Sequence, residues 1–279
     1  MCALLIRDGE PNWWNSPDIW AVPGNDPNGS PGQPTVGQPA YVWGRVRNEG
    51  RSELANVQIR FHWSNPATGV LRSNSTLIGS SFATIPPGPG SSVEVLCLTP
   101  WQPAGVNDGH VCLIAEALHP ADPLPQPPPD AFSPPIYDQV AQRNINLLPA
   151  TAGMMRMMAI QIAAPPRLGR VSLVSIVRDS KGLDDETVRN LGLGKRRFVA
   201  DLPIEAGLLD HPEFDCRNYQ PIERLKRETP AGSIGAIHLA LRVEKIDPDA
   251  YGVLDVVERD AETDELVGGA TYVVIAAEG

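Results

Sequence analysis

The chain has 279 residues, of which 42% are hydrophobic and 20% charged, so it is long enough for two globular domains and too apolar to be disordered. Its formal net charge of −10 repels the phosphate backbone of nucleic acids and anionic membrane surfaces, which excludes nucleic acid as an expected partner. The start, MCALLIRDGEPNWWN, lacks the features of a secretory signal peptide, and no later apolar run is long enough to span a bilayer. We therefore expect synthesis in the cytoplasm without membrane insertion, and leave open a place within a particle or signal-less export.

The first half of the chain consists of short strand-like runs separated by turn residues. The runs are DIWAV, AYVWGRVRN, NVQIRFHW, STLIGSSFATI, SSVEVLCLTPW, GHVCLIAEAL and QVAQRNINLL. Stretches such as NEGRSEL, NPATG and PPGPG lie between them and contain residues typical of turns. Seven such runs without a helical period predict an antiparallel β-sandwich. A proline tract at 119–135 is expected to form a surface-exposed, polyproline-like loop or arm.

Composition changes near residue 150, since all six tryptophans precede it and all four lysines follow it. We expect a domain boundary in LLPATAG, which gives domains at 1–150 and 151–279. The second domain contains the strand-like runs MMRMMAIQIAAPP, GRVSLVSIVRD, KRRFVADLPI, SIGAIHLALRVEKI, YGVLDVVERD and ELVGGATYVVIAA. A short helix is predicted in LDDETVRNLGL, and 208–230 show no clear period. The predicted fold is all-β, with two tandem antiparallel sandwich domains of immunoglobulin type, the second carrying the helix.

Several of these segments resemble the CARDB family, the bacterial cell-adhesion-related domains. The likeness rests on SPDIWAV, VGQPAYVWGRVRNEG, ANVQIRFHWSNPATG, IPPG followed by VEVLCLTPW, and GHVCLIAEA, and it covers about residues 16–148. The resemblance implies an immunoglobulin-like sandwich without catalytic activity that is associated with surfaces and carrying roles.

The strand AYVWGRVRN has two different faces. Ala40, Val42, Gly44 and Val46 are predicted to point inward against a large partner such as Trp63, because side chains alternate along a strand. The outward residues are aromatic or arginine, types that are enriched in interface cores. Together with the tryptophans that precede the first strand, the predicted interface residues are Trp13, Trp14, Tyr41, Trp43, Arg45 and Arg47.

No catalytic, cofactor or metal motif is predicted. The nucleotide-binding glycine patterns, the zinc protease motif and the serine hydrolase motif do not occur. Cys97 and Cys112 lie in apolar strands that could face each other, although buried free thiols are the simpler interpretation. The segment DPDAYGVLDVVE, 247–258, partly matches a calcium loop, but its flanks alternate like strands, so we expect a β-hairpin turn there.

Two functions remain open. The leading hypothesis is a noncatalytic structural or docking component of a larger assembly, in contact with other protein subunits or with copies of itself. The alternative is an adhesin-like module that binds carbohydrate or a surface through exposed tryptophans, chiefly Trp43 or the pair Trp13 and Trp14. Neither hypothesis requires a cofactor.

Overall fold

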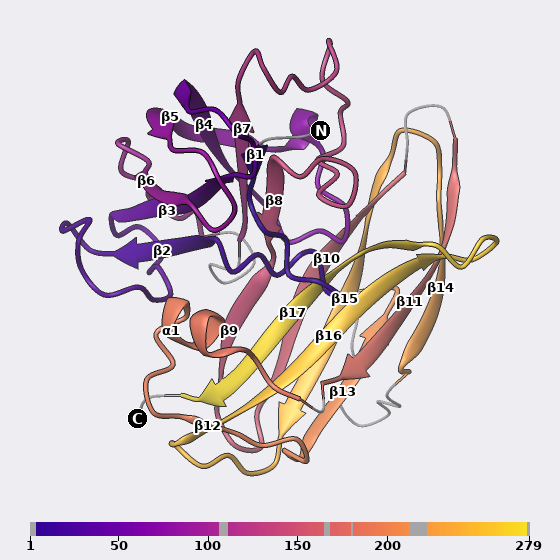
Figure 1. Ribbon diagram of the computed structural model, residues 1–279. Helices are drawn as coiled ribbons and strands as arrows, with labels where there is room; N and C mark the ends of the chain where they lie inside the picture. Colours follow the sequence, from indigo (N-terminus) through magenta and orange to yellow (C-terminus); the bar gives the residue numbers. More distant parts are fainter. Residues whose placement is uncertain (1–3, 106–110, 165–167, 180, 212–221, 278–279) are drawn as a thin grey trace. The chain divides into compact units, whose positions relative to one another are not determined.

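Figure 1 shows the computed structural model, which describes the chain apart from residues 1–3, 106–110, 165–167, 180, 212–221 and 278–279. Strands dominate the described residues, and the only α-helix among them is α1 (Asp185–Asn190). The prediction of an all-β chain with antiparallel sheets and one short helix is confirmed. Among the residues that the structure describes, no helix has the length and apolar character needed to cross a bilayer.

The chain divides into two compact units, each assembled from several segments. The first unit comprises Met1–Ser64, Val70–Asn144 and Asp185–Leu193. The second unit comprises Asn65–Gly69, Ile145–Asp184 and Gly194–Gly279. The predicted boundary near residue 150 therefore differs from the division after Asn144, and α1 belongs to the first unit.

The difference at the boundary arises because the run QVAQRNINLL forms two strands. The earlier strand, β8 (Val140–Arg143), pairs antiparallel with β7 (Cys112–Leu118) in the first unit. The later strand, β9 (Ile145–Ala150), pairs parallel with β17 (Leu266–Ala276) in the second unit. A continuous apolar run does not reveal that its two halves enter different sheets.

The first unit is a sandwich of two antiparallel sheets. In one sheet, β3 (Ala40–Asn48) pairs with β6 (Ser92–Leu96) along one edge and with β2 (Ile19–Pro23) and β1 (Leu4–Leu5) along the other. In the other sheet, the order is β5-β4-β7-β8, with β4 (Leu54–Ser64) and β5 (Thr76–Ile85). Apolar residues from both sheets form one core, which accounts for the stability of the unit.

The inward face predicted for β3 is confirmed. Ala40, Val42 and Val46 are buried in the core, and the residues between them are only partly buried. A Cβ atom at Gly44 would lie 3.0 Å from Cε1 of Phe61, so the large partner over this glycine is Phe61. The prediction that Trp63 would be a core residue is only partly right. Trp63 packs against the core but stays partly buried, beyond the register shift that follows Phe61.

The second unit also contains two sheets around one core. The smaller sheet has the order β10-β15-β13, and the larger has the order β14-β11-β16-β17-β9, with β12 paired to β16. The bounds of these strands are β10 (Met155–Ala163), β11 (Arg170–Arg178), β12 (Arg197–Phe198), β13 (Ile204–Leu209), β14 (Arg224–Thr229), β15 (Ile234–Val243) and β16 (Ala250–Asp260). Alternate residues of both sheets supply the core, as a sandwich requires.

The segment that partly matched a calcium loop lies mostly on a strand. Asp255 and Glu258 belong to β16. Because β15 and β16 lie in different sheets, the connection between them is not the hairpin turn that the sequence predicted. Glu258 is buried and accepts hydrogen bonds from the hydroxyls of Thr68 and Ser172. Burial raises the pKa of Glu258, with those two hydroxyls opposing the shift.

Candidate ligand-binding groove

The outward face of β3 is covered within the first unit. The indole of Trp43 stacks on that of Trp20 with ring centroids 6.1 Å apart and planes 3° apart. Its Nε1 atom donates a hydrogen bond of 2.9 Å to the carbonyl oxygen of Pro27. Trp43 and Tyr41 are both half-buried. One face of the Trp43 ring is therefore already occupied, which leaves little aromatic surface for a sugar.

The arginines of the same face bind carboxylates of their own unit. Arg47 and Arg7 form ion pairs with Asp18, a fully buried carboxylate just before β2, and the Arg7–Asp18 distance is 2.6 Å. Arg45 forms ion pairs with Glu186 of α1 and, at 2.8 Å, with Glu94 of β6. The predicted interface residues Arg45 and Arg47 thus form an interface within the chain, and α1 contributes to it.

Trp13 and Trp14 are not exposed. They are 8% and 1% exposed, and their rings meet edge to face at 5.8 Å. The carbonyl oxygen of Trp14 also accepts a 2.7 Å hydrogen bond from the backbone of Asn144. The hypothesis that this pair stacks on a sugar is wrong, because neither ring has a free face. Burying two large indole side chains removes much apolar surface from water, and this favours the core over an exposed position.

A groove lies on the outer face of the second sheet of the same sandwich. Its volume is about 530 Å³, within the range of roughly 300–1,000 Å³ that is typical of ligand sites. Strand register places Phe82, Gln58 and Leu118 side by side across β5, β4 and β7. The next row contains Arg60 opposite Glu116. Asn56 lines the groove too, at a register shift in β4 where its φ is 59°. Such φ values at residues other than glycine occur often at binding sites.

The wall of the groove comes from the proline tract. Pro120, Pro123, Leu124 and Pro128 line it, and the side chain of Leu124 is buried. The tract therefore folds back over the sheet along part of its length, whereas the sequence predicted an exposed loop or arm. Its cover explains why Glu116, which points outward from β7, is only 2% exposed.

Contacts at residues 70–73 hold the tract in place. Arg72 donates a backbone hydrogen bond to Asp130 at 2.6 Å, and its Nε atom donates to the carbonyl oxygen of Pro129 at 2.8 Å. The Arg72 guanidinium also lies 4.1 Å from the centre of the Phe132 ring. Phe132 is buried and contacts His62 of β4 edge to face. These contacts anchor the tract against β4 and residues 70–73, where it forms one wall of the groove.

Glu116 is the carboxylate at the floor of the groove. Its Oε2 atom lies 2.5 Å from Nη1 of Arg72, and its Oε1 atom lies 3.6 Å from Nε2 of His62 and 3.9 Å from Nη1 of Arg60. Burial works to raise the pKa of Glu116, but the contacts with His62 and Arg72 outweigh it and hold this pKa below its ordinary value. The carboxylate is therefore ionised near neutral pH and is occupied by cationic neighbours.

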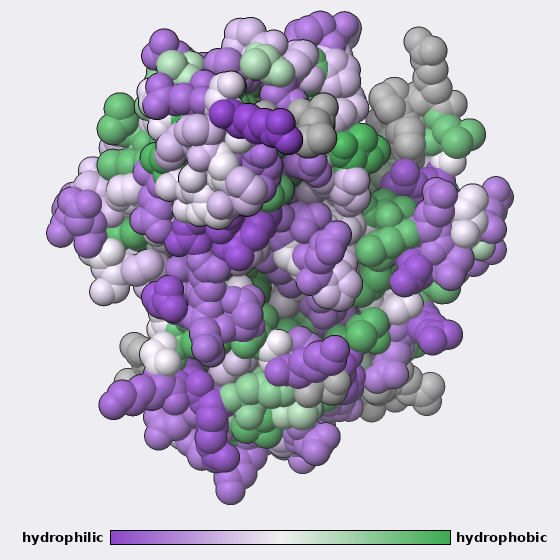
Figure 2. Space-filling view, viewed as in Figure 1, coloured by the Kyte–Doolittle hydropathy of each residue, from purple (hydrophilic) through white to green (hydrophobic). Residues whose placement is uncertain are grey.

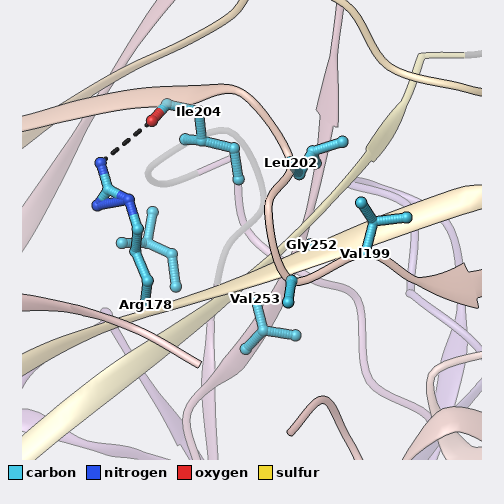
Figure 3. A pocket seen from close by; sticks show the side chains of 8 residues that line it. Arg178, Val199, Leu202, Ile204, Gly252 and Val253 are labelled. Carbon is cyan, nitrogen blue, oxygen red and sulfur yellow. Dashed lines mark hydrogen bonds between the residues drawn. The ribbon is translucent and has the colours of Figure 1, made fainter. Parts of the chain in front are cut away.

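The second unit contains a cavity between Leu202, Ile204 and Gly252 (Figure 3). Its volume is about 10 Å³, which leaves room for at most one water molecule. Arg178 closes it by donating a 3.1 Å hydrogen bond to the carbonyl oxygen of Ile204, the dashed line in Figure 3. A Cβ atom at Gly252 would lie 2.8 Å from Leu202, so this glycine allows the close packing. A cavity of this size is a packing feature and is too small for a ligand larger than water.

Chemistry-bearing side chains are dispersed over the described residues. Among them, no three His, Cys, Asp or Glu side chains gather in a way that would hold a metal ion. Cys97 and Cys112 are buried free thiols, so the disulfide between them that the sequence allowed is not formed. Burial raises the pKa of both thiols, which makes them poor nucleophiles.

Comparisons with known proteins add no family. No family model matches the chain, and no curated protein is similar to it in sequence. Of the properties that the resemblance to CARDB domains implies, the all-β fold with antiparallel sheets is supported, and membership of the family is not.

Two solved structures are similar over much of the chain. One is the CupB6 tip adhesin from Pseudomonas aeruginosa, at 11% identity and a TM-score of 0.27, over 100% of this chain and 99% of that one. The other is a red sea bream transglutaminase, at 12% identity and a TM-score of 0.25, over 90% of this chain and 31% of that one. With both TM-scores below 0.5, neither likeness carries an argument about function.

Proposed function

We propose that this chain is a noncatalytic binding protein that holds a segment of carbohydrate in the groove of its first unit. The groove itself is the observation that carries the proposal. It has the volume of a ligand site, a wall fixed by Arg72 and Phe132, and a floor of polar side chains beside one aromatic ring. Phe82 is 65% exposed and stands in register with Gln58.

This combination suits a sugar better than an apolar ligand. Amide and guanidinium groups, here those of Asn56, Gln58 and Arg60, are planar and can bind neighbouring hydroxyls in pairs. An exposed aromatic ring offers a flat apolar surface to the C–H face of a sugar ring. The adhesin-like alternative of the sequence analysis is therefore kept, but its site moves from the tryptophans to this groove.

The groove also lacks the parts of a glycosidase. Hydrolysis of a glycosidic bond ordinarily needs two carboxyl groups, one of them protonated. Among the described residues that line the groove, Glu116 is the only carboxylate, and its lowered pKa prevents it from serving as a general acid at neutral pH. This supports binding without turnover.

A glycan array followed by calorimetry tests the proposal. The wild-type chain is expected to bind at least one oligosaccharide class, and Phe82→Ala should weaken that binding roughly 10-fold, because stacking on the ring is lost. Leu98→Ala is the matched control, since Leu98 is 72% exposed and lies outside the groove. An array on which the wild type binds nothing at high concentration would refute the proposed function.

The structural or docking role in contact with protein subunits stays a prediction. The arginines and tryptophans on which it relied are engaged within the first unit. On the face seen in Figure 2, hydrophobic residues form separate patches among hydrophilic ones, so that face shows no continuous apolar surface for a partner.

A further inference from the structure

The charges at the floor of the groove do not balance. Two guanidinium groups, those of Arg60 and Arg72, face the single carboxylate of Glu116. Counting these two arginines against Glu116, one positive charge remains uncompensated at this point of a chain whose formal net charge is −10. A local positive charge in a groove attracts an anionic group.

Arg60 is the group that presents this charge to a ligand. The Arg72 side chain approaches Glu116 more closely, at 2.5 Å, and is fixed by Pro129 and Phe132. Within the part of the chain that the structure describes, the ion pair of Arg60 is the long 3.9 Å contact with Glu116, and the Arg60 side chain is 43% exposed. Arg72 therefore neutralises Glu116, and Arg60 remains available to the groove.

We infer that the carbohydrate bound in this groove carries a carboxylate, as a uronic acid does, and that Arg60 binds it. The inference rests on the proposed function. A guanidinium group matches a carboxylate with two parallel N–H···O hydrogen bonds, a geometry that a neutral hydroxyl pair does not reproduce with the same strength. Gln58 and Phe82, one row away, are placed to bind the hydroxyls and the ring of an adjoining sugar.

Calorimetric titration of the full chain with a galacturonic acid oligomer and with its methyl ester tests this inference. The ester keeps the ring and hydroxyls but loses the charge. We expect the acid to bind roughly 10- to 100-fold more tightly than the ester, as a charge-assisted pair would give. Arg60→Gln should abolish that preference, because the planar amide of glutamine can still bind hydroxyls but carries no charge to pair with a carboxylate.

Arg259→Gln provides the matched control. Arg259 of the second unit has a side chain that is 44% exposed and lies 3.9 Å from a carboxylate oxygen of Asp264, so it matches Arg60 in exposure and in ion-pair distance outside the groove. Its substitution should leave the preference for the acid unchanged.

The outcomes separate the two proposals. If acid and ester bind equally well and Arg60→Gln changes neither, the inference fails while carbohydrate binding stands. If no oligosaccharide binds at all, the proposed function fails and the inference with it. If poly-glutamate binds as tightly as the galacturonate oligomer with the same dependence on Arg60, the site recognises an acidic peptide and the inference of a uronic acid is overturned.

Discussion

The two outer faces of the first sandwich carry similar residues and reach different states. On the face of β3, Arg7, Arg45 and Arg47 meet the carboxylates of Asp18, Glu94 and Glu186, and the indole of Trp43 is stacked on that of Trp20. On the face of β4, Arg60 and Arg72 share one carboxylate, and the ring of Phe82 is mostly exposed. Arginine beside an aromatic ring therefore marks a free surface only where the unit does not supply its own carboxylates and its own stacking partner.

Removing Asp18 should break the balanced face and give the largest effect. Asp18→Ala leaves Arg7 and Arg47 without the buried carboxylate that they share, and loss of one partner of a buried ion pair costs about 3–5 kcal/mol of unfolding free energy. Urea denaturation measures this cost. Glu49→Ala, at an exposed position, is the control and should change stability by no more than about 0.5 kcal/mol. Equal stability of the two variants would mean that the charge network does not hold this face.

Aromatic truncations should separate the faces by a smaller margin. Trp43→Ala removes a stacked ring and a hydrogen bond to Pro27, and we expect it to destabilise the unit by about 2 kcal/mol. Phe82→Ala removes a mostly exposed ring and should cost no more than about 0.5 kcal/mol. Thermal unfolding of both variants is the measurement. A larger loss for Phe82→Ala would show that this ring supports the sheet and is not reserved for a ligand.

Acid should weaken both faces through a carboxylate on each. The pKa of Glu116 is lowered, because its contacts with His62 and Arg72 outweigh the effect of burial, which acts to raise it. The pKa of Glu186 is lowered in the same way by its contacts with Arg7 and Arg45. A carboxyl group with a lowered folded-state pKa stabilises the fold above its unfolded pKa, near 4.5, and this contribution is lost as the pH falls through the folded-state value.

Urea denaturation as a function of pH checks the effect of acid. Glu116→Gln should be less stable than the wild type at pH 7, and the difference should shrink as the pH falls below about 4.5. Glu186→Gln should show the same trend with a smaller amplitude, because Glu186 is more exposed than Glu116. A difference that does not depend on pH would assign the effect to packing.

The sequence predicted those parts of the fold that depend on alternation along a single strand. The facing of Ala40, Val42 and Val46 follows from the two-residue period and is correct. The groove could not be predicted in this way, because it depends on which strands pair. Arg60 and Glu116 are 56 positions apart in the sequence and become neighbours only through the register of β4 and β7. A usable signal was present in CLIAEAL, where a carboxylate in an otherwise apolar strand requires a cationic partner.

The expectation that Trp13 and Trp14 are exposed was wrong for a related reason. The sequence around a tryptophan does not show whether its indole is exposed for binding or buried in the core. Which of the two it is depends on contacts with residues that are distant along the chain. Trp43 pairs with Trp20 across the sheet, and the backbone carbonyl oxygen of Trp14 accepts a hydrogen bond from the backbone N–H of Asn144, at the end of the first unit's second segment. Such long-range partners are set by topology, which residue patterns alone do not specify.

The segmented composition of the units bears on the order in which the protein is made. A ribosome releases the chain from its N-terminus, and domains fold as they emerge. Release of residues 1–144 from the ribosome is not enough for the first unit to complete its fold, because Asp185–Leu193 has not yet been synthesised. This last segment brings the Glu186 carboxylate that Arg7 and Arg45 bind. During that interval the nascent chain carries an incomplete charge cluster. For the same reason, a gene cut after residue 150 would encode a first half that never receives its helix.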